Sequence, residues 1–421
     1  MKLKTLVLSS AVALGLAATA ATAATAATAA NQPIRFDGFP DFDSSLKVLL
    51  PDFEKKTGIK VNYLMNNHGD HHTKLTTNLA TGSGAGDVIV VDVEKIGPFV
   101  ASGGLVNLSK QYGVDKYEER FAPYAWAQGK GADGDMYGIP VDLGPGVMYY
   151  RTDVFKQAGL DIQEVIKSWD SYIAAGEKLK SFNIQLIPSA ADVAQAIIFT
   201  TVPEGEGLYF DKDGKPVVTS ERFVHAFEVA KKIRDKGLDG RILAWSNEWY
   251  EGFRNATFAT QLSGAWLLGH LNNWIAPDTT GKWAVSHLPD GIYGSWGGSF
   301  LSIPTQSSHP DKAWQLIEYM TTDREVQLKH FETIAAFPAN VTTYDDALFE
   351  EEVAFLGGQK ARLVFADVAK NIKPVQPARG DHVARSIVLE NALMEVLDEG
   401  KDIKTALKEA ERLILRRTRN L

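Results

Sequence analysis

The stretch "GDVIVVDVEKIGPFVASGG", Gly86 to Gly104, holds the pattern that decides the fold. Its residues 88–91 form an unbroken apolar run, which is typical of a strand buried on both faces of a parallel sheet. The residues that follow, 94–104, have the pattern of a helix that stops at a pair of glycines. A strand that passes directly into a helix is one half of a βαβ unit, so the stretch predicts an α/β fold.

The segments upstream repeat this alternation. We expect strands over 33–39 and 59–66, and helices over 44–58 and 72–82. Successive βαβ units build a parallel sheet with helices on both faces. Open sheets of this kind bind ligands beyond the carboxyl ends of their strands.

Acidic, amide, histidine and aromatic side chains follow each predicted strand at that end. These residues are candidate ligand contacts: Asp37, Phe39 and Asp41 after the first strand, Asn66, Asn67, His68 and Asp70 after the second, and Asp92 after the third. For Asp70, a helix cap is the alternative interpretation.

The second half of the chain is richer in helices. Helices are expected over 168–181, 220–237, 309–322, 384–400 and 402–417, with Ser168 and Ser220 as N-caps. A chain of 421 residues is longer than one hydrophobic core usually supports, so two lobes are expected.

The first 29 residues have the pattern of a secretory signal peptide. Lys2 and Lys4 precede a short apolar stretch, and a tract of small residues offers A-x-A cleavage sites, the last at Ala27-Thr28-Ala29. The sequence contains no cysteine, so no lipid anchor is expected at the cleavage site. We therefore expect an exported, unlipidated protein of the bacterial periplasm.

The charge of the chain argues against nucleic acid and anionic membranes as partners. The formal net charge is −8, and it becomes −10 when the two lysines of the signal peptide are removed. A net acidic protein is a poor ligand for polyanions. No segment after the signal peptide approaches the run of about 20 apolar residues that a membrane helix needs.

A series of short motifs occurs in a fixed order over nearly the whole chain after the signal peptide. The motifs are "LLPDFEKKTGIKV", "GDVIVVD", "ASGGLVNLS", "MYGIPVDLGPGVMYYRTDVFKQAGLD", "SWDSYIAAGEKL", "FATQLSGAWLLGHL", "WGGSFLSIP", "DKAWQLIEYMTTDREVQ" and "AAFPANVTTYDD". With these motifs the chain resembles the family 1 extracellular solute-binding proteins of sugar ABC transporters, the maltose-binding-protein-like group. The histidine-rich loop "NNHGDHH" departs from the usual pattern of that family.

The resemblance implies two α/β lobes, each a mostly parallel sheet flanked by helices, joined by hinge strands around a ligand cleft. On this basis we expect a first lobe of 30–141 plus 303–345 and a second lobe of 142–302 plus 346–421. It also implies a monomer that closes over a mono- or short oligosaccharide and docks onto the permease subunits of an ABC transporter.

Sugar rings stack on aromatic side chains, so the tryptophans are candidate contacts. Glycine and serine neighbours leave open space beside Trp266 and Trp296, and we interpret these two as stacking platforms. Trp245 and Trp249 lie in a polar stretch and are further candidates. Gly298 and Ser299 are expected to offer backbone and hydroxyl groups to the sugar, whereas core packing is expected for Trp126, Trp169, Trp283 and Trp314.

Two later residues complete the candidate set. The resemblance places Asp142 at the cleft, where the chain crosses between the lobes, although a turn-forming aspartate before Gly144-Pro145 is an alternative. Arg379 is a candidate bidentate donor.

Metal binding and catalysis are the main alternatives. His68 and His72 have the i, i+4 spacing of a metal pair, but no cysteine or second histidine cluster completes a site, so we expect no metal. A glycoside hydrolase needs two carboxyl groups flanking one bond, and nothing in the sequence isolates such a pair. We expect a binding protein without a cofactor, with a secreted glycoside hydrolase as the alternative.

Overall fold

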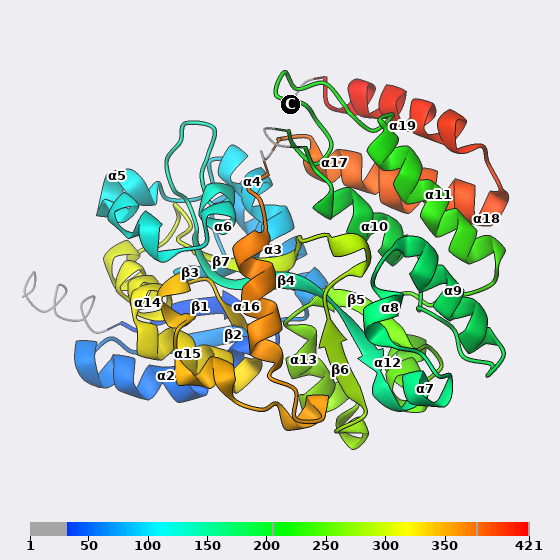
Figure 1. Ribbon diagram of the computed structural model, residues 1–421. Coiled ribbons are helices and arrows are strands. Elements are labelled where there is room, and N and C mark those ends of the chain that lie inside the picture. Colours follow the sequence, from blue (N-terminus) through cyan, green and yellow to red (C-terminus); the bar gives the residue numbers. More distant parts are fainter. Residues whose placement is uncertain (1–31, 204–205, 376–377, 420–421) are drawn as a thin grey trace, which may run out of the picture.

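The computed structural model describes residues 32–203, 206–375 and 378–419. The expected signal peptide, 1–29, lies outside the described residues. Two bodies lie side by side in Figure 1. One contains the N-terminal segments in blue and cyan together with helices in yellow, and the other contains the green segments and the C-terminal helices in red. Segments from distant parts of the sequence therefore build each lobe.

The described strands form one sheet whose main path is β2-β1-β3-β7-β4-β5, with β6 and β8 also paired to β4. The strands are β1 (Ile34–Gly38), β2 (Val61–Met65), β3 (Val88–Asp92), β4 (Ile139–Arg151), β5 (Thr260–Gly264), β6 (Trp283–Ser286), β7 (Ser295–Ser302) and β8 (Phe337–Pro338).

The two ends of this sheet differ in strand direction. In the first lobe, β1 is parallel to both β2 and β3, as expected. In the second lobe, β4 pairs antiparallel with β5 and β6, and the parallel pairing observed there consists of the isolated bridges Gln185–Phe258 and Ile187–Asp239. The expectation of a mostly parallel sheet is therefore wrong for the second lobe. The reason is that β4 is long enough to enter this lobe, where β5 and β6 return beside it in the opposite direction.

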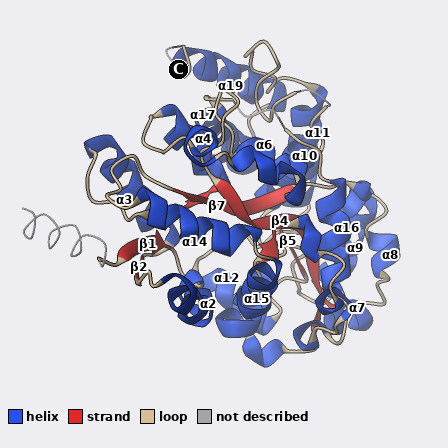
Figure 2. Cartoon of the chain, turned by 90° about the vertical axis from the view of Figure 1, so that its left-hand side faces the viewer, coloured by secondary structure: helices blue, strands red, loops and turns tan. Residues whose placement is uncertain are grey.

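Helices cover the sheet on both sides, above and below the strands in the view of Figure 2. Those of the first lobe are α2 (Phe42–Thr57), α3 (His68–Thr81), α4 (Val93–Ala101), α5 (Leu108–Tyr112), α6 (Pro123–Gln128), α14 (Pro310–Thr322) and α15 (Arg324–Ile334). Those of the second lobe are α7 (Thr152–Gln157), α8 (Ile162–Val165), α9 (Trp169–Lys180), α10 (Ala190–Thr200), α11 (Glu221–Asp235), α12 (Asn247–Asn255), α13 (Leu267–His270), α17 (Asp381–Arg385), α18 (Leu393–Glu399) and α19 (Ile403–Arg417). Helix α16 (Ala361–Asn371) packs against β4.

Short helical turns connect these elements. They are the 3-10 turns η1 (Val114–Arg120), η3 (Pro277–Thr279), η4 (Pro289–Gly291), η5 (Val341–Thr343), η6 (Ala347–Glu350) and η7 (Ala354–Leu356), and the π-helical turns η2 (Leu271–Ile275) and η8 (Ser386–Ala392).

Several local predictions are confirmed. Ser168 caps α9, because its side chain accepts a hydrogen bond from the Ser171 N–H. Ser220 occupies the N-cap of α11, but its side chain makes no capping hydrogen bond. The tryptophans assigned to the core are all buried: Trp126, Trp169, Trp283 and Trp314.

One helix begins earlier than expected. Helix α3 starts at His68, not at His72, and Asn67 is its N-cap. The residues from 68 to 71 therefore form the first turn of a helix, although the glycine and aspartate among them suggested a loop.

Candidate functional site

The carboxyl ends of β1, β2 and β3 lie at one edge of the first-lobe sheet, because these strands are parallel and Gly38 is in register with Met65. His68 and Asp92 meet at this edge, where His68 Nε2 lies 3.3 Å from Asp92 Oδ2. The ring of Phe39 packs 5.0 Å from the His68 ring, centroid to centroid. Three of the predicted contacts, one from each strand end, are thus brought together.

A row of three polar side chains crosses the middle of the sheet. On β7, Ser299 is in register with Asp92 of β3 on one side and with Asp142 of β4 on the other. Residues paired in register lie on the same face of a sheet. Together with His68, which contacts Asp92, these three side chains make up what we call the polar row: His68, Asp92, Ser299 and Asp142.

The two carboxyl groups of the polar row differ in their proton affinity. Burial raises the pKa of Asp142 to about 7, although hydrogen bonds from Ser299 lower it. Burial also opposes ionisation of Asp92, but hydrogen bonds from His68 and from the Glu94 N–H outweigh it and hold the pKa of Asp92 below its usual value. At neutral pH the row therefore contains an ionised acceptor and a carboxyl group that can also donate.

Asp37 lies away from this row, and its carboxylate is engaged within the protein. Its carboxylate accepts hydrogen bonds from Arg35 Nε at 2.7 Å and from the Gly86 N–H at 2.7 Å. Gly86 precedes β3, so these contacts tie Asp37 toward the start of that strand. The side chain is buried and its two oxygens are engaged in holding the strands together.

The amide side chains of Asn66 and Asn67, which follow β2, form hydrogen bonds within the protein. Asn67 Oδ1 accepts from the Asp70 N–H at 2.9 Å, and Asn67 Nδ2 donates to Asp70 Oδ2 at 2.7 Å. This reciprocal pair caps α3, which is the alternative that the sequence offered for Asp70. Asn66 Oδ1 accepts from Lys74 Nζ at 2.5 Å.

The histidines of α3 do not form a metal pair. His72 Nδ1 donates to the His68 carbonyl at 2.9 Å, and His72 Nε2 accepts from the Asp92 N–H at 3.1 Å. Both ring nitrogens are engaged, and burial lowers the pKa of His72 to about 4, so the ring is neutral. Within the described residues no three His, Cys, Asp or Glu side chains gather in a way that could hold a metal ion.

A second cluster, made of tryptophans, lies in the second lobe. Trp245 stacks on Trp266 with ring centroids 5.8 Å apart and an angle of 16° between the rings. His270 packs edge-on against Trp245, Trp266 and Trp274 at 5.5 to 5.7 Å. We call Trp245, Trp266, His270 and Trp274 the tryptophan cluster. Trp245 is 49% exposed and Trp274 is 43% exposed, so the cluster presents aromatic faces to solvent.

Trp249 lies behind this cluster rather than on its surface. Only 2% of it is exposed, and its indole N–H donates to Gln261 Oε1 at 2.8 Å. Its N–H is engaged and its ring is buried, so it supports Trp245, whose ring lies 5.2 Å away. The prediction that Trp249 offers a face to a ligand does not fit this burial.

Trp296 lies between the tryptophan cluster and the polar row. Its carbonyl accepts from Trp266 Nε1 at 2.7 Å, and its ring lies 6.3 Å from that of Phe199 on α10. Three residues further along β7 is Ser299 of the polar row, and Gly298, with a φ of 125°, lies between them. The candidate contacts of both lobes thus share one strand.

The glycines beside the tryptophans serve packing within the protein. A Cβ on Gly264 would lie 2.3 Å from Trp266 Nε1, and a Cβ on Gly144 would lie 1.9 Å from the Trp296 carbonyl oxygen. We expected the small neighbours of Trp266 to leave open space for a ligand. The Trp266 indole itself fills the space beside Gly264.

Four side chains in or near the polar row and the tryptophan cluster were not predicted from the sequence: His270, Trp274, Glu94 and Arg385. His270 Nδ1 lies 2.8 Å from Asp41 Oδ2, and Arg385 Nε lies 3.1 Å from Glu94 Oε1. Trp266, His270 and Trp274 are spaced four residues apart, a helical pattern that would have revealed His270. The predicted arginine, Arg379, lies in the turn before α17.

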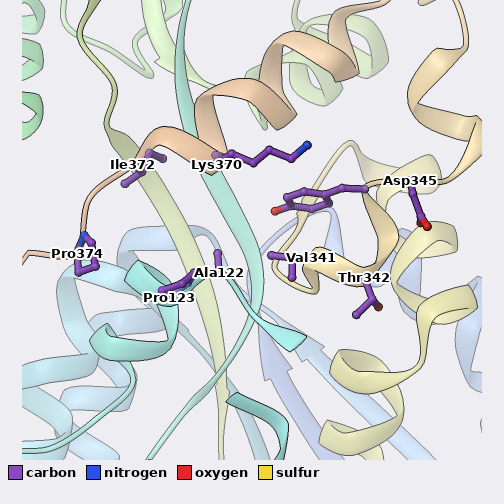
Figure 3. A pocket seen from close by; sticks show the side chains of 10 residues that line it. Ala122, Pro123, Val341, Thr342, Asp345, Lys370, Ile372 and Pro374 are labelled. Atoms are coloured by element: carbon purple, nitrogen blue, oxygen red, sulfur yellow. The ribbon is translucent and has the colours of Figure 1, made fainter. Parts of the chain in front are cut away.

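A cavity of about 640 Å³ lies elsewhere, between α6, η5 and the end of α16 (Figure 3). Its lining residues are Ala122, Pro123, Val341, Thr342, Tyr344, Asp345, Ala369, Lys370, Ile372 and Pro374. None of these residues belongs to the predicted contacts.

A family model described as bacterial extracellular solute-binding protein matches residues 49–357. The chain belongs to this family. The match confirms the resemblance drawn from the motifs. Among the described residues of this solute-binding protein, no helix combines the length and apolar character needed to cross a membrane.

Relatives and solved structures agree with this assignment. The arabinooligosaccharide-binding protein of Bacillus subtilis strain 168 is 24% identical over 364 residues, which is 84% of each chain. An ABC transporter associated binding protein from B. animalis subsp. lactis Bl-04, solved with beta-1,6-galactobiose, is 26% identical, with a TM-score of 0.78 over 91% of this chain and 97% of that one.

The sugar-binding protein MalE of Xanthomonas citri is 23% identical, with a TM-score of 0.73 over 92% of this chain and 98% of that one, and it supports the fold alone. Together these matches confirm the predicted two-lobed α/β fold class. The family and these relatives are binding proteins, which gives no support to the hydrolase alternative.

Proposed function

We propose that this solute-binding protein captures a neutral mono- or short oligosaccharide between its two lobes and delivers it to the permease of an ABC transporter. The observation that carries the proposal is the arrangement along β7. The stacked tryptophan pair contacts β7 at Trp296, near the start of the strand, and the polar row crosses the strand at Ser299. Aromatic faces complement the C–H faces of a pyranose, and mixed donors and acceptors complement its hydroxyl rim.

The identity of the relatives adds independent support. One curated relative is named for arabino-oligosaccharides, and one structural neighbour holds a galactobiose. The charge of the polar row favours a neutral or cationic ligand over an anionic one, because Asp92 is held in its ionised form. Of the candidate contacts predicted from the sequence, we propose that these bind the ligand: Phe39, Asp41, His68, Asp92, Asp142, Trp245, Trp266, Trp296, Gly298 and Ser299.

The location and boundaries of the protein are part of the same proposal. Residues 1–29 are a signal peptide that is cleaved on export, and the mature protein is an unlipidated monomer of the periplasm. The lobes are 30–141 plus 303–345 and 142–302 plus 346–421, with β4 and β7 crossing between them. No chemistry is performed on the sugar.

Thermal unfolding in the presence of a sugar panel tests the proposal. The panel contains arabino-oligosaccharides, beta-1,6-galactobiose, maltose and their monosaccharides. A ligand that binds the folded state raises the melting temperature with its concentration by mass action. At least one sugar is expected to do so, and small-angle scattering should then show a smaller radius of gyration as the lobes close. A melting temperature that no sugar raises would contradict the proposed ligand class.

A further inference from the structure

Trp245 and Trp274 are the most exposed of the nine tryptophans, and they flank the same histidine. Both are close to half-exposed, whereas the other seven are buried or only partly exposed. Their rings pack edge-on against His270, with centroids 5.5 Å and 5.7 Å from its own. Leu243, two positions before Trp245, is also exposed. Large apolar side chains that gather on a surface in this way indicate a binding site.

Trp274 lies too far from Trp266 for one sugar ring to cover both. The two residues are eight positions apart on a continuous helical segment made of α13 and η2, with Trp266 at its N-cap. Eight residues correspond to about two turns, or about 11 Å along a helix axis. This separation exceeds the width of a single sugar ring. A sugar unit held at Trp266 therefore leaves Trp274 open to a second unit.

The Trp274 ring is held in place although it is exposed. Its centroid lies 5.2 Å from that of Tyr250, with an angle of 66° between the rings. Its indole nitrogen lies 3.1 Å from His270 Nδ1. A side chain that its neighbours already hold loses little conformational entropy when a ligand stacks on it. Trp274 is therefore suited to act as a stacking platform.

Two exposed amide side chains precede Trp274 on the same turn. Asn272 Nδ2 donates to Asn273 Oδ1 at 2.9 Å. Within the described residues, Asn272 Oδ1 and Asn273 Nδ2 have no hydrogen-bond partner, so one acceptor and one donor group remain available. Such mixed groups beside an aromatic face suit the hydroxyls of a sugar. The turn is π-helical, a conformation frequently found at functional sites.

We propose that Asn272, Asn273 and Trp274 form an outer sugar subsite, so that the preferred ligand is an oligosaccharide and not a monosaccharide. The inference rests on the proposed function and narrows it. A sugar unit beyond the one at Trp266 stacks on Trp274, and its hydroxyls bond to the two amides. His270, one helical turn before Trp274, contacts Asp41 of the first lobe at 2.8 Å. The outer unit thus lies next to a place where the two lobes touch.

A protein partner is the other possible occupant of an exposed tryptophan. The sugar is favoured because Trp274 adjoins the rest of the tryptophan cluster through His270, and because the amides beside it can still donate and accept. The outer subsite is therefore continuous with the proposed sugar contacts.

Calorimetry against sugars of increasing chain length tests the outer subsite. The probes are arabinose, galactose and glucose, each with its linear oligosaccharides of two to five units. For the sugar type that binds, wild-type affinity should rise with length until a unit reaches Trp274. Trp274→Ala should weaken binding of that length and of longer chains by about two- to tenfold, and leave shorter chains unchanged.

Two further variants and a matched control complete the experiment. Trp274→Phe keeps an aromatic face and should retain most of the affinity for long chains. Asn273→Ala should cause a smaller loss than Trp274→Ala at the same chain lengths. Phe182→Ala is the control, since Phe182 is a similarly exposed aromatic side chain outside the polar row and the tryptophan cluster, and it should change no affinity.

The outcomes separate this proposal from the proposed function. Unchanged affinity at every length in Trp274→Ala would overturn the outer subsite and favour a protein partner at this surface. An equal loss at every length would also overturn it, because Trp274 would then only support the tryptophan cluster. A wild-type protein that binds no member of any series would contradict the proposed function itself, and the outer subsite with it.

Discussion

The polar row and the tryptophan cluster meet through β7, yet they are built in different ways. The polar row takes one side chain from each of several neighbouring structural elements, and β-sheet register aligns Asp92, Ser299 and Asp142. The tryptophan cluster takes Trp266, His270 and Trp274 from α13 and the segments beside it, and Trp245 from a loop with a left-handed φ of 67°. Register is set by the whole sheet, whereas the cluster depends on helical spacing and side-chain contacts. A single mutation should therefore disturb the polar row and the tryptophan cluster differently.

The largest effects are expected for tryptophans, and they separate stacking from packing. Trp296→Ala should weaken sugar binding by about 2–3 kcal/mol, roughly a thirtyfold to hundredfold increase in Kd, while the unliganded melting temperature stays near that of the wild type. Trp283→Ala is the matched control, because Trp283 is fully buried. It should cost about 3–5 kcal/mol of folding stability instead.

Calorimetry for the Kd and thermal unfolding of the unliganded protein provide the paired measurement. Near-normal affinity in a strongly destabilised Trp296→Ala protein would show that Trp296 is a packing residue, and the aromatic half of the comparison would then be wrong.

A smaller effect is expected from the polar row, and it depends on pH. The raised pKa of Asp142, about 7, means that the folded protein holds a proton that the unfolded chain has released. The stability of the folded state therefore falls as pH rises from about 4 to about 7. Asp142 is half-buried, so after allowance for solvent screening we expect a slope worth on the order of 1–2 kcal/mol over this range.

Asp142→Asn should flatten this slope because the amide does not titrate. Denaturant unfolding at several pH values measures it, with Asp70→Asn as a control on an exposed carboxylate. An unchanged slope in Asp142→Asn would mean that Asp142 is solvated in the folded protein.

The amides at the edge of the polar row provide a third test. Asn67→Ala removes the cap of α3 and should cost about 1 kcal/mol of folding stability without changing sugar affinity. Asn66→Ala, which removes only a contact to an exposed lysine, should cost less. A tenfold loss of affinity in Asn67→Ala would restore Asn67 as a ligand contact and enlarge the polar region.

The smallest effect concerns the ion pair that joins α4 of the first lobe to α17 of the second. Burial raises the pKa of Glu94, while the charge of Arg385 lowers it, and the side chains are 41% and 28% exposed. Partly exposed pairs contribute about 0.2–1 kcal/mol. Glu94→Gln and Arg385→Gln should each weaken sugar binding a few-fold, and the double variant should be no worse than either single change.

Salt should weaken wild-type binding by a similar factor and leave the variants unaffected. Fully additive losses in the double variant would show that the two side chains act separately.

The sequence was most informative where function follows from local pattern. The run at 88–91 and its repeats located the parallel strands, and their carboxyl ends located His68 and Asp92. Ser299 was predicted because it follows Trp296 and two glycines, and Asp142 because the family resemblance places its motif at the cleft. Their alignment in one row could not be predicted, since it depends on the register of β7 between β3 and β4.

Other features depend on contacts between distant residues. Asp37 and Asp41 lie four positions apart, yet Asp37 is engaged by Arg35 and Gly86 and Asp41 by His270. No local sequence pattern predicts that these two aspartates have different partners. The same holds for Arg385, which reaches Glu94 across 291 positions of sequence, and for Trp249, whose indole N–H donates to Gln261.

The central claim is that the polar row and the tryptophan cluster together hold a neutral sugar and leave it unchanged. The most direct test is titration calorimetry of the mature protein against the sugar panel. After each titration, chromatography of the solution in the calorimeter shows whether the sugar is intact. We expect saturable binding of at least one sugar, lost or strongly weakened in Trp296→Ala, with the sugar recovered intact. Recovery of cleaved sugar, or the absence of binding to every member of the panel, would contradict it.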